Sequence, residues 1–189
     1  MEDEEKIEKK VKSPRENKLV LKKISDLLTG ICDENKKEKN LFYKPLKVFY
    51  SLNIPLISIK DYLEHIYECT KINSSTLILI LIYIDRICNI NKIKLSYYII
   101  HKLILGSMLI AIKYNEDEIF PYKYYAKIGG VSLSEIFILE YNFIIFINFN
   151  LFITEELFNK YNDYLLSSDS DDSDNWDYDD NDIINNEIK

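Results

Sequence analysis

The stretch YYAKIGGVSLSE, residues 124–135, places the end of one helix next to the start of another. Gly129 and Gly130 close a short aromatic run, and glycine readily adopts the left-handed conformation that ends many helices. Ser132 and Glu135 have the spacing of a capping box, in which the serine oxygen accepts a bond from a free amide of the first helical turn. The stretch therefore predicts two helices joined by a tight turn.

Helical spacing of apolar residues continues outward from this joint in both directions. The run from Leu77 to Ile84 is apolar on all sides, which predicts a central helix that is buried all round. The mixed, aromatic stretch 41–55 predicts an extended segment that lies on the core. The expected helices cover residues 18–31, 58–70, 74–90, 96–115, 121–129, 132–147 and 154–166.

The composition favours helices over a β fold. The chain has 189 residues, of which 47% are hydrophobic, and it contains only 4 glycines and 4 prolines. An all-β domain of this size normally needs more turn residues. Isoleucine and tyrosine nominally favour strands, but the helical periodicity is the stronger signal. The sequence therefore predicts an all-α fold.

The net charge and the cysteines argue against several classes of protein. A charge of −7 disfavours a general nucleic-acid binder, which would carry a basic face. The widely spaced Cys32, Cys69 and Cys88 support neither a disulfide framework nor a zinc site. The charged start, MEDEEKIEKK, is unlike a secretory signal peptide, so we expect a reducing compartment, the cytoplasm or the nucleus.

The apolar stretch 136–153 raises the question of a membrane helix. It is 18 residues long and carries one charge, Glu140, together with three asparagines. A membrane-spanning helix needs about 20 mostly apolar residues, and a carboxylate in its middle is expensive. We therefore expect no membrane span.

The sequence contains no motif for chemistry. It has no Gly-rich phosphate loop, no nucleophile elbow and no HExxH. Its two histidines, His65 and His101, have no nearby cluster of ligands, so no metal site is predicted. We expect no catalytic residue and no cofactor, and we expect His101 to have a structural role.

Lys113 is the residue that most needs an explanation. It ends the apolar run that begins at Met108, within SMLIAIKYNED at 107–117. A lysine is costly to bury without a partner. The residues around it do not by themselves name that partner.

Seven short motifs follow one another along the chain: PLISI at 55–59, DYLEHI at 61–66, YIDRI at 83–87, HKLIL at 101–105, AIKYNED at 111–117, YYAKIGGVSLSE at 124–135 and LEYNF at 139–143. In this order they resemble the cyclin box of the P-type (P/U-type) cyclins, the group related to fungal phosphate-response cyclins. The helix expected at 18–31 also resembles that group's N-terminal helix.

The resemblance implies a domain organisation. Residues 55–166 are expected to form the cyclin box, a five-helix bundle followed by a C-terminal helix, and 18–54 an added N-terminal helix with its linker. Residues 1–17 are expected to be a charged, flexible start, and 167–189 a disordered acidic tail. P-type cyclins have one such box.

The resemblance also implies a partner. Similar cyclins bind a cyclin-dependent kinase as a heterodimer, hold its C-helix in the active position and perform no chemistry themselves. Their AxK lysine and LE glutamate lie together at the kinase interface, which assigns that role to Lys113 and Glu140 here; a bond that merely ties two helices together is the alternative. By register, further contacts are expected at Ile110, Tyr114, Ile144, Ile147, Phe149 and Leu151.

Two departures from the family pattern stand out. His65 replaces the usual arginine that pairs with the aspartate of the IDR motif, here Asp85. We hypothesise that His65 and Asp85 pair instead; a neutral hydrogen bond from His65 to another group is the alternative. The MRxxL-type motif of cell-cycle cyclins is also missing from this helix, so docking of an arginine-leucine peptide is not predicted.

Two further classes of function remain as alternatives to a kinase regulator. One is an adaptor with the same bundle fold that binds a non-kinase protein. The other is an enzyme, which the missing motifs disfavour. A nucleic-acid-binding form of the adaptor is weakened by the net charge of −7.

Overall fold

The computed structural model describes residues 14–37 and 44–167, and in these residues the chain is all-α, as the sequence predicts. The predicted flexible start lies outside them except for 14–17, and the predicted acidic tail except for Ser167. The α-helices are α1 (Pro14–Glu34), α2 (Ile59–Thr70), α3 (Ser74–Asn91), α4 (Ile100–Asn115), α5 (Tyr122–Gly129), α6 (Leu133–Phe146) and α7 (Glu155–Leu166). Two short 3₁₀ helices are η1 (Asn35–Lys37) and η2 (Lys44–Phe49).

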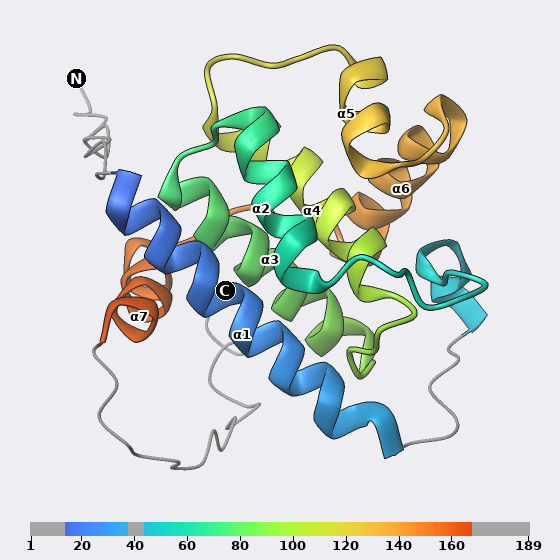
Figure 1. Cartoon of the computed structure of the whole chain (residues 1–189), viewed down its shortest axis with the longest axis horizontal. Coiled ribbons are helices and arrows are strands. Elements are labelled where there is room, and N and C mark those ends of the chain that lie inside the picture. Colours follow the sequence, from blue (N-terminus) through green and yellow to red (C-terminus); the bar gives the residue numbers. More distant parts are fainter. Residues whose placement is uncertain (1–13, 38–43, 168–189) are drawn as a thin grey trace, which may run out of the picture.

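Helix α3 is the centre of the bundle. All eight residues from Leu77 to Ile84 are buried, which confirms the predicted central helix. Helix α4 packs along α3, and α1 crosses both α2 and α3 (Figure 1). Figure 1 also shows α5 and α6 together on one side of the bundle and α7 on the other.

The predicted helix boundaries rest on short polar contacts. The Ser58 hydroxyl accepts a hydrogen bond from the Asp61 amide at 3.0 Å, and the Ser132 hydroxyl accepts one from the Glu135 amide at 3.1 Å. Gly130 ends α5 in the left-handed region, with φ of 66°. The Glu135 carboxylate pairs with Lys102 at 2.8 Å, so only the serine half of the predicted capping box is formed.

Three predicted segments differ from the structure. Helix α1 begins four residues before the predicted start at residue 18, and α4 begins four residues after the predicted start at Ser96. The Ser96 carbonyl accepts the Ile99 and Ile100 amides instead, which forms a turn before α4. The segment predicted to be extended contains η2; it does lie on the core, because Leu46 and Phe49 are buried.

The apolar stretch 136–153 is not one helix. Helix α6 ends at Phe146, and Asn148 and Phe149 have φ of 55° and 57°, which turns the chain. Among the described residues, α3 alone is long and apolar enough to cross a membrane as a single helix. Most of α3 is buried by its neighbours, as in the core helix of a globular bundle.

The hypothesised pair of His65 and Asp85 is wrong. His65 is exposed on α2, where its nearest polar partner is the Cys69 sulfur at 3.9 Å. Asp85 instead accepts a hydrogen bond at 2.6 Å from the Tyr161 hydroxyl, which ties α7 to α3. Burial raises the pKa of Asp85, and the Tyr161 hydrogen bond and the charge of Arg86 oppose that rise.

Helices α4 and α6 approach each other closely at Gly106. A methyl group built on Gly106 would lie 2.8 Å from the Cδ2 atom of Phe143, which is itself fully buried. The two helices can therefore pack this closely only because residue 106 has no side chain. Gly30, on the exposed side of α1, has no neighbouring atom within 4 Å of such a methyl group.

Replacing Gly106 with alanine is expected to destabilise the chain by about 1–3 kcal/mol, because the added methyl overpacks the α4–α6 contact. The control is Gly30→Ala, which should stabilise α1 by up to about 1 kcal/mol through helix propensity. Urea unfolding of both variants measures the two free energies. Equal effects of the same sign would contradict the close contact at Gly106.

Replacing Tyr161 with phenylalanine is expected to cost about 1–3 kcal/mol at neutral pH, because the Asp85 carboxylate loses a donor. The folded-state pKa of Asp85 should rise further, so the loss should shrink as pH falls through that pKa and the carboxyl becomes protonated in both variants. Urea unfolding at about pH 7 and about pH 4 measures this.

The control for the Asp85 contact is His65→Arg, which should change stability by less than about 0.5 kcal/mol because His65 is exposed. A larger effect of His65→Arg than of Tyr161→Phe would restore the His65–Asp85 pair and refute the Tyr161 contact.

Candidate functional site

Lys113 leaves the core at the last turn of α4. The residue before it, Ile112, is buried, whereas the Lys113 side chain is 34% exposed. Its ammonium lies 2.5 Å from a carboxylate oxygen of Glu140 on α6, whose side chain is 11% exposed. The structure therefore brings together the two residues that the sequence paired.

The Lys113 ammonium is held in its charged form. Burial acts to lower the pKa of Lys113, but the hydrogen bonds to Glu140 and Tyr122 outweigh burial and raise it above the usual value. Its contribution to stability is therefore present below the unfolded pKa and is lost only as pH rises through the folded pKa. A fixed positive charge thus persists at the molecular surface across the neutral range.

Tyr122 completes this site and was missed by the sequence reasoning. Its hydroxyl donates to the second Glu140 oxygen at 2.5 Å and accepts from the Lys113 ammonium. The only sequence signal is its place at the start of α5, next to Pro121. Contacts across 9 and 18 residues of chain could not be read from that position.

An exposed aromatic face adjoins the pair. Phe137 and Ile144 lie three and four residues from Glu140 and therefore share its side of α6, and Tyr141 follows Glu140 directly and lies one turn from Phe137. Phe137 is 46% exposed and Tyr141 is 68% exposed. Exposed aromatic side chains beside a partly exposed lysine are typical of a protein-binding surface.

The turn after α6 presents a further aromatic residue. Phe149 is 71% exposed and lies in the left-handed region, which a bulky residue occupies only at a cost of about 1–3 kcal/mol. Arg86 holds the following chain by donating to the carbonyls of Asn150 at 2.8 Å and Phe152 at 3.0 Å. The geometry of this turn is thus imposed from α3.

The other predicted contacts fall into two groups. Tyr114, next to Lys113, is exposed, and Ile144 and Leu151 are partly buried at the edge of the core. Ile110 and Ile147 are 3% and 0% exposed, so the expectation that they contact a partner directly is corrected. Ile110 faces inward on α4, which is buried almost throughout. Ile147 faces inward at the residue that follows the end of α6.

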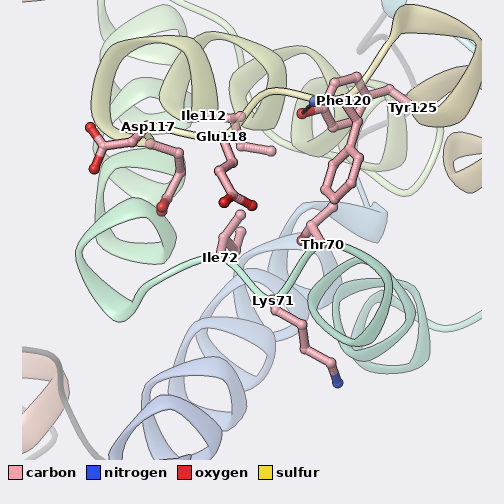
Figure 2. A pocket seen from close by; sticks show the side chains of 9 residues that line it. Thr70, Lys71, Ile72, Ile112, Asp117, Glu118, Phe120 and Tyr125 are labelled. Carbon is pink, nitrogen blue, oxygen red and sulfur yellow. Dashed lines mark hydrogen bonds between the residues drawn. The ribbon is translucent and has the colours of Figure 1, made fainter.

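The pocket in Figure 2 lies between the end of α2 and the chain after α4 and has a volume of about 340 Å³. Lys71 points away from its acidic residues in this view. The acidic Glu116 at its wall accepts hydrogen bonds from Asn73, through the amide at 3.0 Å and the side chain at 2.9 Å, and from Thr76. Glu116 therefore caps the start of α3, which is a structural role.

A second hollow of about 500 Å³ lies between α2, α4 and the α5–α6 turn. At its wall Lys102 pairs with Glu135, and the His101 Nε2 atom lies 3.0 Å from the Ile57 carbonyl oxygen, whereas the buried His101 Nδ1 atom has no hydrogen-bond partner among the described residues. His101 is buried and its ring contacts that of Tyr62, as expected of a packed histidine. Within residues 14–37 and 44–167, no three His, Cys, Asp or Glu side chains gather as a metal site would require.

Comparison with known proteins agrees with this architecture. The cyclin family model matches residues 11–151. The chain is 30% identical to Cyclin-U4-1 of Arabidopsis thaliana over 157 residues, which are 79% of this chain and 78% of the relative. It is 35% identical to Cyclin-U4-3 of the same plant over 144 residues, 75% of this chain and 64% of the relative.

A fungal protein is similar as well. The PHO85 cyclin-like protein psl1 of Schizosaccharomyces pombe is 35% identical over 127 residues, 65% of this chain and 51% of the relative. The chain thus spans from about half to about four fifths of the length of these relatives. The matched region contains α1 to α6 and the Lys113–Glu140 pair, and the chain belongs to the cyclin family as a P/U-type cyclin with a single cyclin box.

Proposed function

We propose that this chain is a non-catalytic regulatory subunit that binds a cyclin-dependent kinase as a heterodimer and activates or directs it. The observation that carries the proposal is the Lys113–Glu140 pair at the edge of the aromatic face of α6, in which Lys113 is partly exposed and Glu140 is largely buried. Membership of the cyclin family supports the class of partner.

The mechanism needs no catalytic group on this chain. A protein kinase is active only when a glutamate of its C-helix pairs with the lysine that holds the ATP phosphates. A subunit that binds this conformation more tightly than the inactive one shifts the population toward it. Binding of the kinase to the surface formed by α4 and α6 would therefore be sufficient to activate it.

Different residues of this surface would contribute binding energy and binding specificity. Exposed aromatic side chains, such as Tyr114, Tyr141 and Phe149, would supply most of the binding energy by leaving water. Lys113 and Glu140 would set the register, because their remaining hydrogen-bonding capacity must be matched by polar groups of the kinase. The buried Ile110 and Ile147 support this face from beneath.

An adaptor that binds a non-kinase protein through the same face is the second candidate. The exposed aromatic face favours a protein partner of some kind and does not by itself specify a kinase. The net charge of −7 argues against nucleic acid on this surface.

The test is a pull-down from the native cell with the tagged wild type and the charge-reversed variant Lys113→Glu/Glu140→Lys. The reversal keeps an ion pair between α4 and α6 but inverts what the partner meets. We expect the wild type to recover a cyclin-dependent kinase and the variant to lose it, with affinity reduced roughly thirtyfold or more.

The matched control is Lys102→Glu/Glu135→Lys, which reverses the other ion pair between the same two helices. It should retain the kinase. If the kinase still binds the Lys113→Glu/Glu140→Lys variant, the interface lies elsewhere on the chain. Recovery of a non-kinase protein by the wild type would favour the adaptor.

A further inference from the structure

The Lys113–Glu140 pair has a third member, Tyr122. The Tyr122 hydroxyl donates to Glu140 at 2.5 Å, and it accepts a hydrogen bond from the Lys113 ammonium. The same ammonium lies 4.3 Å from the centre of the Tyr122 ring. One phenol therefore contacts both charges.

Tyr122 is itself held by groups outside the ion pair. Its ring packs on Phe137 of α6, with ring centres 4.3 Å apart. It is the first residue of α5, and Pro121 before it restricts the backbone at that point. Helices α5 and α6 also pack against each other. The position of the phenol is thus set by α5 and α6.

Lys113 has no comparable restraint of its own. Its side chain has four flexible bonds, loses rotamer freedom when it is fixed, and is 34% exposed. The Glu140 carboxylate is better enclosed, at 11% exposed, and needs a donor for each oxygen. Lys113 donates a hydrogen bond to one Glu140 oxygen, and Tyr122 donates one to the other.

We propose that Tyr122 is a positioning residue that holds Lys113 and Glu140 in the geometry a kinase recognises before the kinase arrives. This role rests on the proposed kinase binding and deepens it. A partner that meets a pre-organised pair loses less free energy in ordering it, so affinity rises without a new contact. Tyr122 acts through the pair.

The test compares Tyr122→Phe with Tyr124→Phe in binding to the recovered cyclin-dependent kinase. Phenylalanine at 122 keeps the ring on Phe137 and removes only the hydroxyl. The control removes another hydroxyl of α5, which donates to the Cys69 carbonyl at 2.8 Å. We expect the Kd to rise roughly tenfold for Tyr122→Phe and to stay within about twofold for the control.

A double-mutant cycle separates positioning from a purely structural role. In a Lys113→Met/Glu140→Met background there is no charged pair to position, so adding Tyr122→Phe should change the Kd by less than about twofold. A structural role would weaken binding equally in both backgrounds, and that result would overturn the proposal.

A measurement on the free chain gives a readout without the kinase. Titration of the Lys113 side chain by NMR should show a lower pKa in Tyr122→Phe than in wild type, because one group that favours the charged form is gone. Circular dichroism checks that the variant is folded. An unchanged Lys113 pKa in the folded variant would refute the contact.

The outcomes distinguish the two proposals. Loss of the kinase in Lys113→Glu/Glu140→Lys, with wild-type affinity in Tyr122→Phe, would overturn the positioning role and leave the proposed function intact. Failure of the wild type to bind any cyclin-dependent kinase would overturn both.

Discussion

The burial of α3 on every side is the constraint on which the rest of the structure depends. Eight consecutive buried residues leave no polar face, so the other helices must cover it all round. Close packing of this layer is possible because Gly106 lets α4 and α6 approach each other. The hydroxyl of the buried Tyr83 is satisfied by the Leu151 carbonyl at 3.0 Å, which ties the chain after α6 to the same helix.

Polar residues at the ends of the buried helices organise the surface. Asp85 and Arg86, in the last turns of α3, hold α7 and the turn that presents Phe149. Glu116, just beyond α4, caps the start of α3. Lys113 emerges where α4 leaves the core and meets Glu140. The candidate binding face therefore lies where the apolar helices extend beyond the core and other helices no longer cover them.

Helix α6 carries the outer face on which the proposed partner would bind. Its inner side, with Ile136, Leu139 and Phe143, completes the core, yet Phe137 and Tyr141 on its outer side are also large and apolar. Outer residues of this kind contribute little to the stability of the free chain. The exposed Phe149, with its strained backbone, does not stabilise the free chain either. A protein partner that covers them gives these residues a physical role, in keeping with the cyclin family.

Local signals in the sequence predicted much of the fold. Caps at Ser58, Ser132 and Gly130 set helix boundaries through contacts only a few residues apart, and the apolar run of α3 predicted its burial. The Lys113–Glu140 pair could be predicted because family motifs mark both residues. These features depend on neighbours along the chain or on a recognisable pattern.

Only the tertiary structure decided the rest. His65 and Asp85 do not meet, because contact between helices depends on the relative placement of their axes, which no short motif specifies. Ile147 faces inward and Tyr141 outward on an almost uniformly apolar stretch, where periodicity carries little information. Tyr122 joins three separate segments, so its contacts arise only when α4, α5 and α6 have packed together.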